Sequence, residues 1–260
     1  MDSEGITARG VEMRFGQRGA GEPVLQDLDV DVAPGSFVTL LGPSGCGKST
    51  LLKILGGILE PVSGDVRIAG RPAPQSVRDK EIGLVLQQPA LLPWKNAREN
   101  AALLAEIAGG GRRDTRSAAD EALDLVGLTA AANKLPHELS GGMAQRVSIA
   151  RALAMDPKIL LMDEPFGALD AITRDEMNMK LAEIWAATRK TVVFVTHSIP
   201  EAVFLSDVVH VMQAHPGRVV DTLEVDLPRP RTRDLFDDSR FGEYARRLRD
   251  RLEPEPQRSV

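Results

Sequence analysis

One stretch of the chain combines glycine, lysine and serine in a spacing that suits phosphate binding. Residues 42–49 read GPSGCGKS and fit the pattern G-x-x-x-x-G-K-[ST], which requires a strand before it and a helix after it. Backbone N–H groups in such a loop and at the helix N-terminus converge on phosphate oxygens. Lys48 would reach the β- and γ-phosphates, and Ser49 would supply a hydroxyl to Mg²⁺. The pattern predicts a nucleoside triphosphate site.

The predicted contacts to this nucleotide follow the loop and the start of the helix: Gly42, Pro43, Ser44, Gly45, Cys46, Gly47, Lys48, Ser49 and Thr50. Cys46 is the single cysteine of the chain. We interpret it as a small residue tolerated in the loop, because free cysteine behaves as a small hydrophobe. One cysteine excludes an internal disulfide framework.

A pair of carboxylates ends a second apolar run, KILLMDEP at 158–165. Neighbouring residues of a strand point to opposite faces, so the two acids need not share a role. In phosphoryl transfer one carboxylate holds Mg²⁺ and another orients or deprotonates the attacking water. We assign Asp163 to the metal and Glu164 to the water, with a merely solvated strand end as the alternative.

The segment LSGGM at 139–143 holds two glycines where a helix is expected to begin. Ser140 is a good N-cap, yet each glycine costs a helix about 1 kcal/mol relative to alanine. Glycines at a helix entrance let a ligand approach the backbone, and the free N–H groups there favour an anion. Gly141 and Gly142 therefore predict an anion site far along the chain from the phosphate loop.

Length and composition describe an ordinary globular chain. It has 260 residues, 43% of them hydrophobic and 27% charged, with a net charge of −5. That length suits one large α/β domain or two small ones, and the negative charge does not suggest a nucleic-acid binder. No apolar run approaches the roughly 18 residues of a membrane span, and the first residues do not resemble a signal peptide. We expect a cytosolic chain, or one peripheral to a membrane from that side.

Apolar periodicity indicates how these residues are positioned. Strands are expected at 5–15, 24–32, 36–42, 64–69, 82–86, 159–162, 191–196 and 208–212. Helices are expected from about Lys48 to Gly56 and over much of 97–154. This order predicts a parallel-sheet core, a β-rich N-terminal piece and an inserted helical subdomain. His197 ends the strand TVVFVTH, at the edge where α/β sheets place their ligands. Beyond about 216 a Pro/Arg-rich stretch and a charged helix near 240–252 suggest a peripheral tail, solvated or regulatory.

Together these motifs resemble, in type and order, the ATP-binding subunit of an ABC transporter. LSGGM resembles the family signature, Gln87 in VLQQP its Q-loop, residues 168–170 its D-loop and His197 its switch histidine. The resemblance covers roughly residues 6–215. It implies an α/β P-loop NTPase (RecA-like) core, about 1–88 and 155–215, with an N-terminal antiparallel β subdomain and an inserted helical subdomain, about 89–154. The remaining tail would be 216–260.

The resemblance also implies a role for each motif. Two such subunits face each other head to tail, so Ser140, Gly141 and Gly142 would contact the ATP held by the partner. Gln87 would sense Mg²⁺ and the attacking water, Asp170 would bridge the subunits, and His197 would contact the γ-phosphate. The implied catalytic set is Glu164, His197, Gln87 and Lys48, and the implied Mg²⁺ set is Ser49, Gln87 and Asp163. Phe15 would stack on adenine, with core packing as the alternative.

The segment LLPW at 91–94 suggests a partner. An exposed aromatic-aliphatic patch there would suit a helix of a membrane permease, with Leu92 and Trp94 as contacts. The alternative is a turn that packs Trp94 inward. LLPW, DEPFGALDAITR and VTHSIPEAVFLSD together resemble bacterial importers of the nitrate/sulfonate/taurine group. That group implies an ATPase pair on the cytoplasmic face of the inner membrane, a permease dimer and an extracytoplasmic solute-binding protein.

Several residues depart from the family pattern without removing a catalytic group. Leu86 stands where phenylalanine is common, Phe15 where tyrosine is frequent, and Ala144 where this group often has glutamine. The rival functions are a soluble ABC ATPase acting on DNA or ribosomes, and a P-loop GTPase or kinase. Soluble ABC ATPases usually carry a long coiled-coil insertion or two ATPase domains in one chain, and neither is visible in this sequence. P-loop GTPases and kinases lack the LSGGM segment. The transported solute is not readable from these residues.

Overall fold

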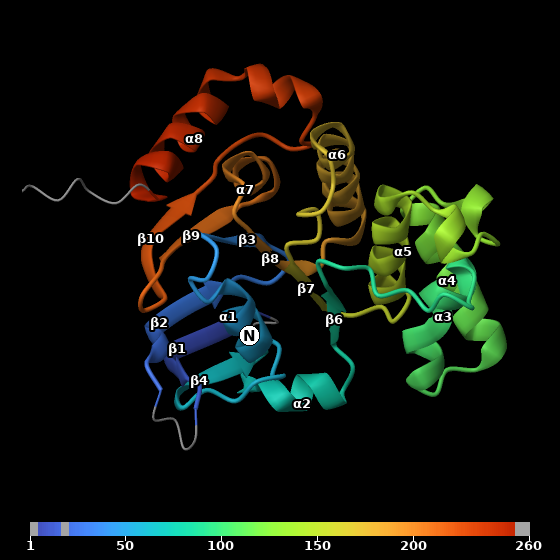
Figure 1. The fold of residues 1–260 in the computed structure, drawn as a ribbon, viewed down its shortest axis with the longest axis horizontal. Coiled ribbons are helices and arrows are strands. Elements are labelled where there is room, and N and C mark those ends of the chain that lie inside the picture. The colour runs from blue at the N-terminus through green and yellow to red at the C-terminus, as the bar shows by residue number, and fades with distance from the viewer. Residues whose placement is uncertain (1–4, 17–20, 253–260) are drawn as a thin grey trace, which may run out of the picture.

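Two sheets form the centre of the part of the chain that the structure, a computed structural model, describes: residues 5–16 and 21–252. The larger sheet has the strand order β10-β9-β3-β8-β7-β6, and the smaller has the order β2-β1-β4-β5. Figure 1 shows α1 and the small sheet on one side of the larger sheet, and α6, α7 and α8 on the other. The predicted α/β fold with a P-loop NTPase core is confirmed.

The larger sheet is parallel over five of its six strands. These are β3 (Phe37–Leu41), β6 (Ile82–Val85), β7 (Ile159–Asp163), β8 (Thr191–Thr196) and β9 (Val208–Gln213). Every residue of β3 and β8 is buried. Continuous apolar runs are what a parallel strand covered on both faces requires.

The smaller sheet is antiparallel and belongs to the N-terminal part of the chain. It contains β1 (Ile6–Arg14), β2 (Pro23–Val32), β4 (Ser63–Ile68) and the short β5 (Arg71–Pro72). In β2, buried Leu28, Val30 and Val32 alternate with exposed aspartates, so one face packs inward and the other meets solvent. The inner face shares a core with α1 (Lys48–Leu55). The helix α2 (Ala73–Arg78) was not predicted.

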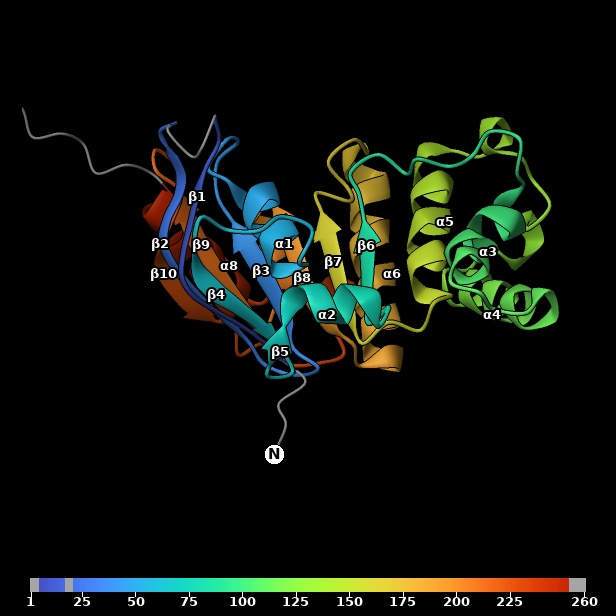
Figure 2. The same cartoon turned by 90° about the horizontal axis from the view of Figure 1, so that it is seen from below.

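Three α-helices lie between β6 and β7 in the chain: α3 (Ala97–Ile107), α4 (Arg112–Leu125) and α5 (Gly141–Leu153). Two short 3-10 turns, Thr129–Ala131 and Pro136–Glu138, connect α4 to α5. Asn96 and Glu99 form a capping box that starts α3. Figure 2 shows these helices beyond β6, at one end of the molecule, with α5 nearest the sheet. Their position separates the LSGGM segment from α1 by several strands.

The remaining helices pack on the far side of the larger sheet. They are α6 (Ala171–Thr188), α7 (Ile199–Leu205), the 3-10 turn η4 (Arg233–Asp237) and α8 (Ser239–Leu252). None of the helices in residues 5–16 and 21–252 is both long and apolar enough to cross a membrane.

The chain beyond residue 216 differs from the peripheral tail that was expected. Strand β10 (Arg218–Glu224) pairs antiparallel with β9 and forms the edge of the larger sheet. Leu223, Phe241 and Leu248 are buried in the main core. Buried Arg231 donates to the carbonyls of Val203, Phe204 and Ser206 at the end of α7. Residues 218–252 therefore complete the fold, and the predicted charged helix is α8.

Candidate nucleotide site

Four of the predicted motifs follow four adjacent parallel strands. The phosphate loop follows β3, His197 follows β8, Asp163 ends β7 and Gln87 lies just after β6. The strands are in register at this edge, because Leu41 pairs with Thr196, Asp163 with Val195, and Val85 with Met162. In parallel α/β sheets the carboxyl edge is where ligands bind. The fold thus brings these motifs to one edge.

The phosphate loop turns sharply into α1 through two glycines in the left-handed region. Gly45 has φ 82° and Gly47, the N-cap of α1, has φ 94°. A side chain is strained at such angles, which explains glycine at both positions. Buried Lys48 donates from Nζ to the carbonyls of Gly42 and Pro43 at 2.8 and 2.9 Å. The lysine therefore folds back along the loop.

The side chains of the loop divide into exposed and buried ones. Pro43, Ser44 and Gly45 are exposed, Thr50 is half-buried, and Cys46 is 1% exposed. Burial raises the pKa of the Cys46 thiol, so the thiol stays protonated and unreactive near neutral pH. The Cys46 side chain packs in the core beneath the loop, and its backbone N–H donates to the Pro43 carbonyl at 3.4 Å.

Two oxygen ligands suited to Mg²⁺ meet beside the loop. Ser49 Oγ donates to Asp163 Oδ1 at 2.7 Å. No group of three or more His, Cys, Asp or Glu residues in the described parts of the chain is placed to hold a metal by itself. A hydroxyl and one carboxylate fit Mg²⁺, which in nucleotide sites takes one or two carboxylates and completes its shell with phosphates and water. The donor set fits this cation when a nucleotide accompanies it.

Glu164 directly follows β7 and points toward the loops that follow β8 and β3. Its Oε2 lies 3.0 Å from Nδ1 of His197, and its Oε1 lies 3.9 Å from Nζ of Lys48. The backbone of Glu164 has φ 42°, outside the usual range for a residue with a side chain. Such strain costs about 1–3 kcal/mol and is concentrated at functional sites. Glu164 is one-fifth exposed and His197 half exposed, so both face solvent.

The side chains of Gln87 and Glu164 both lie near Gly167, a glycine that was not predicted to belong to the site. A Cβ at Gly167 would lie 3.1 Å from Gln87 Nε2 and 3.5 Å from Glu164 Oε2. Glycine at this position leaves room for both the Gln87 amide and the Glu164 carboxylate. No local pattern marks Gly167, because the neighbour it accommodates is far away in sequence.

Two side chains of α5 hold the segment around Gln87 and were also missed. Buried Gln145 donates from Nε2 to the Leu86 carbonyl at 3.1 Å. Arg151 donates to the carbonyls of Pro89 and Ala90 at 2.6 and 2.9 Å. The helix that begins with the LSGGM segment is therefore bonded to the loop on both sides of Gln87. A shift of α5 would carry this loop with it.

The LSGGM glycines have different surroundings. Ser140 caps α5 by accepting from Met143 N at 3.3 Å, as predicted. Gly142 is buried, and a Cβ there would meet Thr173 Cγ2 at 2.8 Å, whereas Gly141 is exposed. Packing within the chain thus accounts for one glycine, while the other leaves the helix entrance open. The structure does not bring this entrance to the phosphate loop of the same chain, since β6 and β7 lie between α5 and α1 in both views (Figures 1 and 2).

Asp170 caps the next helix, α6. Its carboxylate accepts from Thr173 N and Thr173 Oγ1 at 3.1 and 2.7 Å, and these bonds lower the pKa of Asp170. Asp170 itself is exposed, and Ile172 beside it is 75% exposed. The start of α6 therefore presents a carboxylate and an apolar side chain to solvent.

Phe15 and Trp94, for which inward packing was the alternative to a binding role, are both exposed. Phe15 is 49% exposed and Trp94 is 71% exposed, so neither packs in the core of the described chain. The turn that carries Trp94 is rigid. Fully buried Asn100 accepts from Leu92 N at 2.7 Å and donates to the carbonyls of Leu92 and Lys95. Leu92 is half-buried beside the exposed indole.

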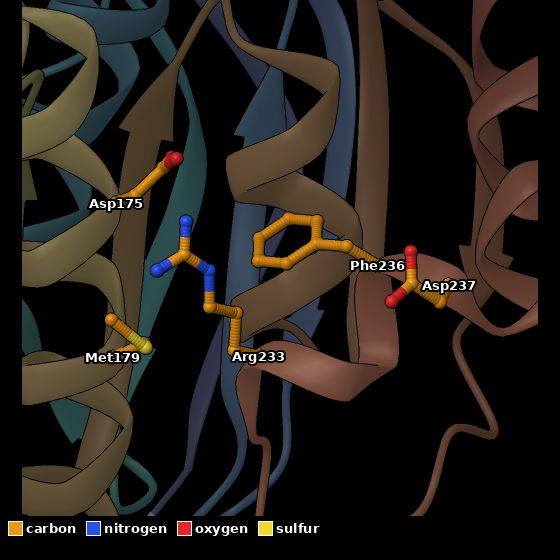
Figure 3. A pocket seen from close by; sticks show the side chains of 5 residues that line it. All are labelled: Asp175, Met179, Arg233, Phe236 and Asp237. Carbon is orange, nitrogen blue, oxygen red and sulfur yellow. The ribbon is translucent and has the colours of Figure 1, made fainter.

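A cavity of about 240 Å³ lies away from these motifs, between α6 and η4 (Figure 3). Its lining residues are Asp175, Met179, Arg233, Phe236 and Asp237. None of them belongs to the predicted site, and we assign the cavity no ligand.

Comparison with known proteins agrees with these motifs. Residues 25–167 match the family model described as ABC transporter. The taurine import ATP-binding protein TauB of Pseudomonas aeruginosa is 43% identical over 94% of this chain and 94% of its own. The nitrate import ATP-binding protein NrtD of Synechococcus elongatus is 44% identical over 84% of this chain and 81% of its own.

A solved structure extends the likeness to a nucleotide-bound protein. It is the dimeric post-hydrolysis state of the ATP-binding cassette MJ0796 bound to ADP and phosphate. The MJ0796 chain is 32% identical in sequence and superposes with a TM-score of 0.75. The match covers 86% of the present chain and the whole of the MJ0796 chain. The matched family, the four motifs along one sheet edge and these relatives lead to one conclusion: the chain belongs to the ABC transporter family, as an ATP-binding subunit that hydrolyses ATP to drive transport.

Proposed function

We propose that the chain energises a bacterial importer through ATP-driven closure and reopening of a pair of ATPase subunits. One observation carries this proposal. The phosphate loop, Asp163, Glu164 and His197 lie along one edge of the sheet, while the open helix entrance at Gly141 lies beyond β6. Each chain thus holds two separated half-sites, and a head-to-tail pair of chains would complete both.

The described contacts support a division of labour at the nucleotide. The phosphate loop residues, from Gly42 to Thr50, would surround the phosphates, and exposed Phe15 would stack on adenine. Ser49, Asp163 and Gln87 would hold Mg²⁺, which supplies charge neutralisation on the phosphate oxygens. Ser140, Gly141 and Gly142 of the second chain would contact the γ-phosphate from the other side.

Hydrolysis would then use the side chains around Glu164. Its carboxylate would accept a proton from the attacking water, and His197, 3.0 Å from Glu164 Oε2, would contact the γ-phosphate. Gln87, which lies near Gly167 as Glu164 does, would orient the water. Loss of the γ-phosphate removes the group that bridges the two chains, so ATP acts by favouring the closed state over the open one.

The movable units are proposed as the core, about 1–88 and 155–215, and the helical subdomain, about 89–154. Gln145 bonds α5 to Leu86, near the end of the first core segment, and Arg151 bonds α5 to Pro89, the first residue of the insertion, which supports movement of the loop with the helices. Leu92 and Trp94 would bind a helix of an integral membrane permease, because the rigid turn exposes the indole. Asp170 would bridge the two ATPase subunits.

The remaining assembly is inferred from the relatives. The likeness to taurine and nitrate import proteins supports a peripheral position on the cytoplasmic face of the cell membrane. The transported solute would be nitrate, a sulfonate, taurine or a related small solute delivered by an extracytoplasmic binding protein. The ATPase pair would be a homodimer or a dimer with a homologous subunit, and no nucleic acid is involved.

Affinity purification of the chain from its native membranes in mild detergent tests the assembly. Copurifying proteins are identified by mass spectrometry, with Trp94→Ala as the matched bait. Recovery of a polytopic permease and a solute-binding protein by the wild-type chain supports the importer. Recovery of ribosomal or DNA-associated proteins alone overturns it in favour of a soluble ATPase.

A further inference from the structure

A buried carboxylate lies directly behind the loop that carries His197. Glu201, on α7, is only 4% exposed; it lies in the segment VTHSIPEAVFLSD but is not one of the predicted site residues. Its Oε2 accepts a hydrogen bond from Thr196 Oγ1, and its Oε1 lies 3.7 Å from Arg174 Nε. A buried carboxylate requires such partners, because removing its charge from water is costly. Its two contacts lead to two different loops of the site.

The first contact holds the loop of His197. Thr196 is the last residue of β8, and its Oγ1 also accepts from Ser198 N at 3.0 Å. Ser198 Oγ in turn accepts from Glu201 N at 3.4 Å as the N-cap of α7. Both chain neighbours of His197 are therefore bonded to Glu201. The carboxylate holds Thr196, directly before His197, and the backbone N–H of Glu201 holds Ser198, directly after it.

The second contact holds the loop of Asp170. Arg174 donates from Nη2 to the Leu169 carbonyl at 2.8 Å. Leu169 immediately precedes Asp170, whose carboxylate is exposed at the start of α6. The Arg174 guanidinium thus bonds to the backbone beside Asp170 and pairs with Glu201 at the same time.

The ion pair between the two side chains is incomplete. Arg174 Nε is buried and has no hydrogen-bond partner, and at 3.7 Å from Glu201 Oε1 it lies just beyond bonding distance. A buried ion pair is weak evidence for stability, since desolvation offsets its attraction. A displacement of a few tenths of an ångström at the start of α6 would complete this bond. The observed contact therefore lacks one hydrogen bond that a closer approach would form.

We propose that Arg174 and Glu201 are positioning residues that link the loop of Asp170 to the loop of His197, so that seating of a partner subunit at Asp170 aligns His197 for hydrolysis. The inference rests on the proposed roles of Asp170, Glu164 and His197. Neither Arg174 nor Glu201 touches the nucleotide in this account. Their effect is on kcat, because they align a group that acts in the transition state.

Steady-state ATPase kinetics on the full chain, assembled with its permease, test the link. The variants are Arg174→Met, Arg174→Lys, Glu201→Gln and the Arg174→Met/Glu201→Gln double variant. We expect each of Arg174→Met and Glu201→Gln to lower kcat about tenfold while KM for ATP changes less than about twofold. The double variant should lose no more than the worse single variant, and Arg174→Lys should recover part of kcat.

A matched control removes another ion pair far from the site. Arg229 pairs with Asp207 at 2.7 Å and lies over the Trp185 ring. Arg229→Met should lower the melting temperature without lowering kcat. Arg174→Met should lower kcat without lowering the melting temperature. Arg174 is one-third exposed, so its replacement leaves a measurable folded protein even where Glu201→Gln does not.

The outcomes separate the link from the proposed function. The link is overturned if the kcat losses of the two single variants multiply in the double variant, or if Arg174→Met has the wild-type kcat. In either case the proposed catalytic roles still stand if Glu164→Gln and His197→Ala are inactive. If Glu164→Gln and His197→Ala both hydrolyse ATP at the wild-type rate, the proposed catalytic roles fall as well.

Discussion

Glu164 Oε2 lies 3.0 Å from Nδ1 of His197, across two adjacent strand ends. The left-handed backbone of Glu164, at φ 42°, turns the carboxylate away from Asp163 and toward the neighbouring loop. Asp163 is bonded instead to Ser49. Two acids that are adjacent in sequence thus have different partners, which the alternation of a strand alone could only suggest.

The contact of Gln87 with Gly167 predicts that a single methyl group slows hydrolysis. In Gly167→Ala the added Cβ lies 3.1 Å from Gln87 Nε2, so the amide must shift by a few tenths of an ångström from its present position. We expect kcat to fall about two- to tenfold, with KM for ATP nearly unchanged, in a steady-state ATPase assay. Gly242→Ala on α8 is the matched control, because a Cβ there meets nothing within 4 Å. Equal rates for Gly167→Ala and wild type would remove Gly167 from the account.

The packing of Gly142 against Thr173 predicts that a substitution at Thr173 can offset the loss of stability caused by one at Gly142. Gly142→Ala places a Cβ 2.8 Å from Thr173 Cγ2 and should destabilise the chain by about 1–3 kcal/mol in urea unfolding. Thr173→Ser removes that methyl group while keeping the hydroxyl bonded to Asp170, and should restore part of the loss. Additive destabilisation in the double variant would show that this contact is not the cause.

Exposure of the Trp94 indole predicts that its removal weakens assembly with the permease but leaves nucleotide binding unchanged. Trp94→Ala should weaken binding to the permease about tenfold or more, because buried tryptophans dominate interface energies. ATP affinity, measured by calorimetry, should stay unchanged. Ile107→Ala, at an equally exposed apolar position on α3, provides the control. Normal assembly of Trp94→Ala would place the permease contact elsewhere.

Buried His210 is expected to contribute to the loss of folding stability at acidic pH. Burial lowers its pKa below 6.5, so the folded chain favours the neutral ring. Between that lowered pKa and 6.5 the unfolded chain binds more protons, and the free energy of unfolding falls as the pH falls. The melting temperature of wild type should therefore drop more than that of His210→Gln between about pH 7.5 and about pH 5.5. Parallel drops in both proteins would contradict this assignment.

The nucleotide motifs were predictable because their information is local. The phosphate loop, the run ending in Asp163 and the strand before His197 each lie within a few residues, and apolar strands place such ends at one edge. The contacts of Gly167 with Gln87, and of Glu201 with Arg174, join segments far apart in sequence, so no spacing reveals them. Strand β10 was not predicted because Leu223 is its only buried residue, so the apolar alternation over 218–224 is weak.

The measurement that tests the account most directly is the mass of Glu164→Gln in solution, by light scattering, with and without Mg²⁺ and ATP. Glu176→Gln, which changes an exposed carboxylate on α6, is the matched control. If Glu164 activates the water in a site completed by a second chain, turnover falls at least about 100-fold in Glu164→Gln and ATP doubles the mass of this variant. Turnover at the wild-type rate, or an ATP-bound monomer, would contradict a site completed by a second chain and driven by Glu164.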